Sequence, residues 1–185
     1  LKERIISYFQ NVDHFSWSSV KTKSDEFLLK NILKMNYTRG IGTGSGGGAS
    51  FGLDVHNALE AVLKGRAKPE DFSGDVEMAV KNGLSALEDL KKKYSGLKII
   101  DIEVEVPVPL NSIVAYERDD LTFTGKIDVL LKHDKGYLMV DWKTSASDSY
   151  VSDNKRQLSV YKKMYSKREK IPEKEITTCV IFISK

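Results

Sequence analysis

The sequence predicts an α/β fold in which a central mixed β-sheet is flanked by helices. Apolar residues recur at helical spacing in the first half of the chain, the spacing changes to two after Gly96, and a helical stretch separates the last two strands. The chain has 185 residues, of which 41% are hydrophobic, enough for one substantial core. We therefore expect a single domain over 1–185, with a helical part at 1–95 and a sheet-bearing core at 97–185.

Helical segments dominate the predicted N-terminal part. Short apolar stripes start at Ile5 and Phe27, and longer stripes cover 51–62 and 76–94. The stretch 40–48 is too rich in glycine for a helix or a strand, so a loop is expected there. That loop lacks the Gly-x4-Gly-Lys pattern that cradles phosphates, and no such motif occurs elsewhere in the chain, which excludes a helicase engine within it.

Strands are predicted where apolar and polar residues alternate. The run from Ile100 to Val108 places Glu103 and Glu105 on the face opposite its apolar residues. The segments 121–131 and 137–143 form two further strands, and the turn-rich residues between them are typical of a hairpin. A helix over 153–168 and a strand over 176–183 complete the predicted order.

Composition narrows the class of protein. Lys and Arg number 29 against 26 Asp and Glu, a formal charge of +3, so any basic surface must be local. A single cysteine, Cys179, excludes an internal disulfide, a Cys-rich zinc site and an iron–sulfur cluster held by this chain. Because no apolar run approaches the roughly 20 residues that span a bilayer, we expect no membrane partner. An intracellular location is expected, in the cytoplasm, the nucleoid or, for a viral chain, the infected cell.

The residues best suited to chemistry lie on the predicted hairpin. Alternation puts Asp141 and Lys143 on one face of their strand, and pairing of the two strands as a hairpin could bring Asp128 beside Asp141. Two carboxylates within about 4–6 Å repel each other unless a cation lies between them. Hard divalent cations prefer carboxylate oxygens, and the adjacent Lys143 is placed to hold a developing anion or to orient a water.

Each of these features has a simpler interpretation when it is taken alone. An Asp-x-Lys pair in a strand is typical of a surface ion pair, and His56 beside an apolar stripe is typical of a core histidine. Gln157 and Tyr161, one helical turn apart, are an ordinary helix pair, and the acids of 103 and 105 form an ordinary solvated strand face. Their joint occurrence is what favours a functional site.

The ordered set of these residues resembles the RecB-like branch of the PD-(D/E)XK nuclease superfamily. The set consists of Gly52-x3-His56, Glu105, Gly125-x2-Asp128, Asp141-x-Lys143 and Gln157-x3-Tyr161. The resemblance extends from about Phe15 to the C-terminus. It implies a restriction-endonuclease-like core and a metal-dependent nuclease that uses Mg²⁺ or Mn²⁺.

The resemblance also implies a role for each matching residue. Asp128 and Asp141 are the central metal ligands, His56 and the Trp142 carbonyl are further ligands, and Glu105 is an additional acid of the site. Lys143 positions or activates the attacking water, while Gln157 and Tyr161 orient the nucleic-acid strand or support Lys143. One and two metal ions are both compatible with this set.

The favoured function is hydrolysis of DNA phosphodiester bonds, with single-stranded or end-bearing DNA as the substrate. Two alternatives stay open: an RNA-directed endonuclease of the same superfamily, and a nucleic-acid-binding module without catalysis. DNA is the expected partner. A second copy of the chain and a helicase or repair protein are also compatible with this interpretation.

Overall fold

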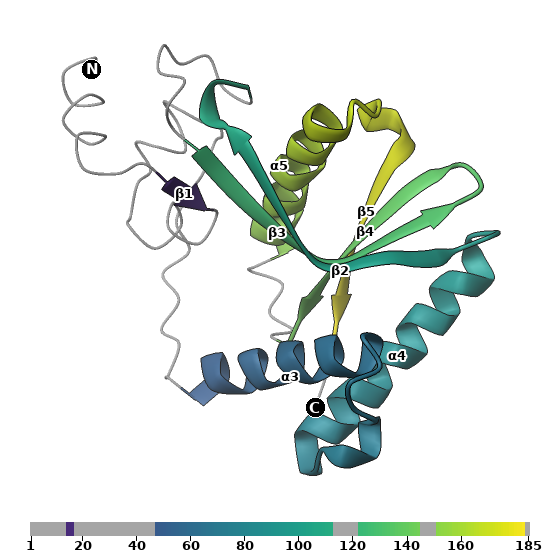
Figure 1. Ribbon diagram of the computed structural model, residues 1–185. Helices are drawn as coiled ribbons and strands as arrows, with labels where there is room; N and C mark the ends of the chain where they lie inside the picture. Colours follow the sequence, from purple (N-terminus) through teal and green to yellow (C-terminus); the bar gives the residue numbers. More distant parts are fainter. Residues whose placement is uncertain (1–13, 17–46, 113–121, 145–150, 184–185) are drawn as a thin grey trace.

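The computed structural model describes residues 14–16, 47–112, 122–144 and 151–183 (Figure 1). Its helices and strands follow the order β1 (His14–Ser16), α3 (Gly47–Leu63), α4 (Gly74–Lys93), β2 (Lys98–Pro109), β3 (Thr122–His133), β4 (Gly136–Lys143), α5 (Val151–Glu169) and β5 (Ile176–Phe182). The strands form one mixed sheet, and the predicted fold class is confirmed. Within the described residues, no helix combines the length and apolar character needed to cross a membrane.

The N-terminal part differs from the sequence prediction. The stripes that start at Ile5 and Phe27 and residues 40–46 of the predicted loop lie outside the described residues. Gly47 and Gly48, which we expected in that loop, begin α3. The strand β1 falls in a part predicted to be helical. Three residues are too few to show a period, and β1 is a strand because it pairs with β3.

The sheet is organised around β3. β2 pairs antiparallel with β3 along nearly its whole length, so β1 and β4 share the other edge of β3. β1 pairs in parallel with residues 122–124 of β3, and β4 pairs antiparallel with residues 129–133 of β3. Among the described residues, 125–128 have no strand partner on that edge. Because β4 continues beside β5 as far as Lys143, β3 and β4 diverge beyond the Val129–Val140 pair. We call this place, bounded by 125–128 and 141–143, the β3–β4 fork.

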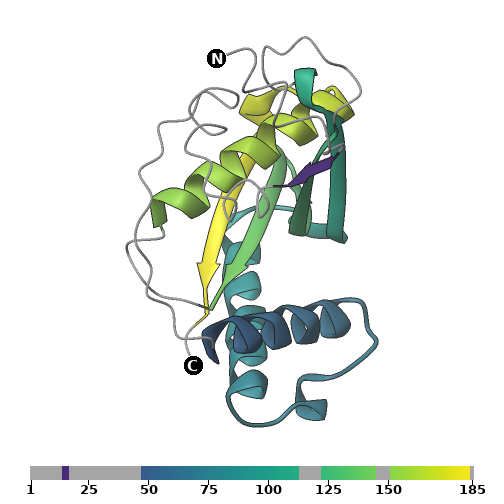
Figure 2. The same ribbon diagram turned by 90° about the vertical axis from the view of Figure 1, so that its left-hand side faces the viewer.

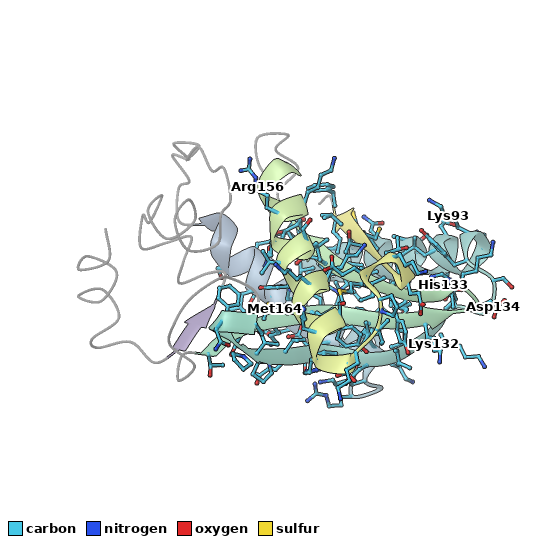
Figure 3. The ribbon with its side chains drawn as sticks, turned by 90° about the horizontal axis from the view of Figure 1, so that it is seen from above. Lys93, Lys132, His133, Asp134, Arg156 and Met164 are labelled. Atoms are coloured by element: carbon cyan, nitrogen blue, oxygen red, sulfur yellow. The ribbon has the colours of Figure 1, made fainter. Side chains whose placement is uncertain are left out.

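A tight hairpin connects the two strands of the fork. The predicted hairpin is present, and its turn is shorter than the predicted connection, because His133 pairs with Gly136 across two residues. Gly136 has a φ of 141°, and a Cβ at this position would collide with the backbone carbonyl of Glu175. The Asp134 N–H donates to the carbonyl of Ser95, which ties the turn to the segment after α4. Figure 3 shows His133 and Asp134 at one end of the sheet.

The helices cover different parts of the sheet (Figures 1 and 2). α5 contacts strands β2 to β5, whereas α3 and α4 pack against each other and against the fork strands. The buried cluster between α3, α4 and these strands comprises Val55, Ala58, Leu59, Ala79, Val80, Leu87, Leu97, Val129, Leu131, Leu138, Val140, Trp142 and Ile183. Five consecutive β3 residues, 127–131, are buried, since helices pack on both sides of this stretch.

The alternation predicted for β2 holds only in its second half. Val104, Val106 and Val108 are buried, as expected, but Ile100 is 47% exposed. A register shift between Ile99 and Asp101 explains the difference, because one extra residue reverses which side chains face the core.

Gly125 allows α5 to lie close to β3. A Cβ at this position would lie 2.7 Å from Cδ1 of Tyr161. We expect Gly125→Ala to lower the free energy of unfolding by about 1–3 kcal/mol, as measured by urea denaturation, because the added methyl group overpacks a buried contact. The same substitution should cost less in a Tyr161→Ala background. An equal cost in both backgrounds would contradict this explanation.

Candidate functional site

Asp128 and Asp141 lie at the β3–β4 fork. Asp128 directly precedes Val129 and Asp141 directly follows Val140, the last pair before β3 and β4 diverge. The charge of Asp141 acts on Asp128, so the structure brings together the two acids that we predicted to be neighbours. Across the gap, the backbone N–H of Trp142 donates to Oδ2 of Asp128 at 2.8 Å. Asp128 is 8% exposed and Asp141 is 4% exposed, so neither charge is well solvated by water.

The two buried carboxylates have unfavourable electrostatics. Burial, together with the negative charge of Asp141, raises the pKa of Asp128 to about 8. Burial also raises the pKa of Asp141, against the opposing effect of Lys143. The Lys143 ammonium contacts both oxygens of Asp141, at 3.0 and 2.7 Å. This contact serves only one of the two acids, so the pair is short of positive charge.

α3 brings His56 to the acid pair. Its Nε2 lies 3.0 Å from the Trp142 carbonyl oxygen, and since a carbonyl only accepts, Nε2 carries the proton. In the neutral ring Nδ1 therefore bears a lone pair, and it faces Oδ2 of Asp128 at 3.6 Å, too far for a direct hydrogen bond. Burial, followed by the charge of Lys143, lowers the pKa of His56 and favours that neutral ring. A lone pair aimed at a carboxylate is stabilised when a cation lies between them.

Gly52, one helical turn before His56, allows α3 to approach the end of β4. A Cβ at Gly52 would lie 3.0 Å from the hydroxyl oxygen of Thr144, the residue directly after β4. The spacing Gly52-x3-His56 therefore has a structural reason: the glycine brings the helix close, and the histidine on the next turn reaches the fork.

The acid that β2 contributes is Glu103 rather than Glu105. Glu105 is exposed, and its backbone lies opposite that of Lys126 in the β2–β3 ladder. Its carbonyl accepts a hydrogen bond from Arg168, so the structure does not place Glu105 with the other site residues. Glu103 follows the same register to a position opposite Asp128 and has a φ of 60°, which is unusual for a residue other than glycine. The sequence does not separate the two acids because alternation puts both on one face.

His56, Glu103 and Asp128 each direct one ligand atom into a common region. These three atoms all lie within 4.8 Å of one another. Two carboxylate oxygens and a neutral imidazole nitrogen form a donor set that suits a divalent cation such as Mg²⁺ or Mn²⁺. The set fits the metal that the resemblance implies. The Trp142 carbonyl oxygen accepts a hydrogen bond from His56, so its role as a metal ligand stays a prediction.

Gln157 and Tyr161 lie on α5 and contact each other. The Gln157 side-chain amide donates to the Tyr161 hydroxyl at 3.0 Å, and that hydroxyl also hydrogen-bonds the backbone of Lys126. Tyr161 is 5% exposed, so it fixes α5 against β3 beside the fork, whereas Gln157 is half-buried. These contacts position α5 beside the fork, and the role predicted for the pair toward the nucleic-acid strand or Lys143 stays a prediction.

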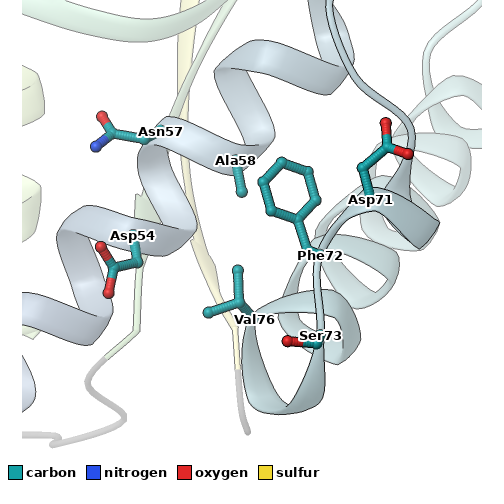
Figure 4. A pocket seen from close by; sticks show the side chains of 7 residues that line it. All are labelled: Asp54, Asn57, Ala58, Asp71, Phe72, Ser73 and Val76. Atoms are coloured by element: carbon teal, nitrogen blue, oxygen red, sulfur yellow. The ribbon is translucent and has the colours of Figure 1, made fainter.

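A separate hollow lies between α3, the short 3-10 helix η2 (Pro69–Asp71) and the start of α4 (Figure 4). Its volume is about 450 Å³, and it is lined by Asp54, Asn57, Ala58, Asp71, Phe72, Ser73 and Val76. None of the fork residues lines it. The carboxylate of Asp71 is already engaged there by the backbone N–H of Lys68, so this hollow is not part of the candidate site.

Comparison with known proteins gives one family match. The model of the PD-(D/E)XK nuclease superfamily matches residues 26–184, which include His56 and both fork strands. No curated protein matches the chain.

The raised pKa of Asp128 makes stability depend on pH in the absence of metal. The folded protein holds this proton up to about pH 8, while the unfolded chain releases it near 3.8. Between these values the folded state binds more protons, so the stability of the metal-free protein should fall as pH rises. Asp128→Asn keeps an acceptor for the Trp142 N–H and removes the charge. We expect it to flatten this slope and to add about 1–2 kcal/mol at pH 8.

Urea denaturation in EDTA between pH 5 and pH 8 measures this slope. The matched control is Asp101→Asn, which changes an exposed acid of β2. Parallel pH profiles for the wild type and Asp128→Asn would show that the fork does not hold the buried, proton-binding acid described above.

Proposed function

We propose that this chain, which belongs to the PD-(D/E)XK nuclease superfamily, is a RecB-like nuclease that hydrolyses DNA phosphodiester bonds with Mg²⁺ or Mn²⁺. One observation carries the proposal: at the β3–β4 fork, a buried Asp128 faces the unprotonated nitrogen of His56, while Asp141 holds Lys143. A proton offsets the charge of Asp128 in the metal-free protein. Once Asp128 is ionised the group is short of positive charge, and a divalent cation would take the place of that proton.

The residues of the fork divide the work of hydrolysis. Asp128, His56 and Glu103 would hold the ion. Asp141 is outside this group, but its charge acts on both Asp128 and His56. A bound divalent ion supplies Lewis-acid polarisation of the scissile phosphate and lowers the pKa of a bound water. Asp141 holds the Lys143 ammonium through a hydrogen bond to Oδ1 and an ion-pair contact to Oδ2. Lys143 is thereby positioned to orient the water and to stabilise developing negative charge.

Residues of α5 support the proposal that the substrate is a nucleic acid. The helix that carries Gln157 and Tyr161 also carries the basic residues Lys155, Arg156, Lys162 and Lys163, with Lys167 and Arg168 in its last turn. Lys and Arg contacts to phosphates position a strand without reading its sequence. The Gln157–Tyr161 pair favours the RecB-like branch, and with it DNA that is single-stranded or has a free end.

Two alternatives make different predictions for a cleavage assay. Matched DNA and RNA strands, single-stranded and duplex, are incubated with Mn²⁺, Mg²⁺ or EDTA. We expect metal-dependent cleavage of DNA. Cleavage restricted to RNA would favour the RNA-directed endonuclease, and binding without turnover in either metal would favour a non-catalytic module.

Metal binding tests the assigned ligands directly. Isothermal titration of Mn²⁺ into the protein should show affinity weakened about tenfold or more by Asp128→Asn and by Glu103→Gln. Glu105→Gln is the matched control, because it changes an acid of the same strand that the structure places outside the group. We expect this control to bind Mn²⁺ like the wild type. Equal affinities for all four proteins would overturn the metal site, and a loss confined to Glu105→Gln would reverse our assignment of the β2 acid.

Substitution of Lys143 distinguishes an effect on substrate affinity from an effect on the rate of hydrolysis. We expect Lys143→Ala to bind DNA and Mn²⁺ nearly normally and to lose about 10²–10³ in kcat, because its ammonium acts on the transition state. Lys143→Arg should restore little activity, since a planar guanidinium does not reproduce a compact ammonium. Single-turnover cleavage and DNA binding are measured on the same preparations. A parallel loss of affinity and rate would instead make Lys143 a simple phosphate contact.

A further inference from the structure

One of the candidate metal ligands is already paired with a cation that belongs to the chain. The Lys126 ammonium forms an ion pair with the Glu103 carboxylate. The Glu103 side chain is only 12% exposed, whereas that of Lys126 is 54% exposed. The lysine therefore reaches into the site from its solvent side and neutralises an acid that a metal ion would also use.

This pairing is diagonal across two strands. In the β2–β3 register Lys126 stands directly opposite Glu105, and Glu103 lies two residues earlier in β2. Diagonal neighbours are within reach of long side chains, so Lys126 can contact either acid. Its ammonium lies on Glu103, the acid beside Asp128, which indicates that the negative charge of the fork draws it there.

We propose that Lys126 is a displaceable counter-ion: it occupies Glu103 when no divalent cation is bound, yields that carboxylate to the ion, and then contacts a substrate phosphate. This inference rests on the proposed function, because it needs the ion at the fork and a phosphate above it. The ammonium and the ion compete for one carboxylate, since a divalent cation coordinates that oxygen more strongly than a half-exposed ammonium.

The exchange predicts effects of opposite sign for one substitution. Without Lys126 the ion has no competitor on Glu103, so metal affinity in the absence of nucleic acid should increase. With the ion in place, the loss of the released ammonium should weaken nucleic-acid binding. A lysine that served only the stability of the sheet would produce neither change in the folded protein. A lysine that only contacted phosphate would produce the second change alone.

The experiment compares Lys126→Met with Lys132→Met. Methionine keeps most of the apolar stem, and Lys132 is an exposed lysine of the same strand that Figure 3 places near the hairpin turn. Mn²⁺ affinity is measured by calorimetry on the full chain without nucleic acid. Binding of a labelled single-stranded DNA is measured by anisotropy with Ca²⁺ over a series of salt concentrations.

We expect Lys126→Met to bind Mn²⁺ about threefold to fivefold more tightly. We also expect it to bind DNA more weakly, with a salt dependence reduced by about one phosphate contact. Lys132→Met should change neither quantity. Unchanged or weaker Mn²⁺ binding by Lys126→Met would overturn the exchange while leaving the proposed function intact. Failure of the wild type itself to bind Mn²⁺ would overturn both, and these two failures are distinguishable.

Discussion

The hydrogen bond from the Trp142 N–H to Asp128 is the contact on which the site depends. β3 and β4 stop pairing just before this point, and the Asp128 carboxylate replaces the backbone acceptor that Trp142 has lost. The same residue directs its carbonyl to His56. Since the Trp142 side chain is 2% exposed and packs in the core, the backbone that orients both groups is held rigidly.

The buried carboxylates of the site lower the stability of the folded protein, and the rest of the fold compensates for this cost. Asp128 and Asp141 are buried at positions where apolar side chains would stabilise the core, and Lys143 relieves only part of the cost. Lys126 partly offsets the charge of the third acid, Glu103, from the solvent side. Such departures from a stable core are expected where a protein binds a charged ligand, because selection for function opposes the best packing.

The parts of the fold that follow from local sequence could be predicted, and those set by register could not. The hairpin and the neighbouring acids Asp128 and Asp141 follow from alternation and a short turn, both visible in the sequence. The exposure of Ile100 depends on a register shift in β2, and the choice of Glu103 over Glu105 depends on which acid lies opposite Asp128. The alternation of apolar and polar residues does not show where a register shift occurs. It also places both acids on the same face, so it does not distinguish Glu103 from Glu105.

The hydrogen bond between His56 and the Trp142 carbonyl joins residues 86 positions apart in the chain. It connects α3, which precedes the sheet strands that form the fork, with the strand that carries Asp141. An ion held by His56 and Asp128 would act as a crosslink between these two parts, and by mass action it would stabilise the docked helix by about 2.7 kcal/mol at a free concentration one hundred times its Kd. The ion would thereby add to the core packing of Val55 and Leu59 in holding α3 on the sheet.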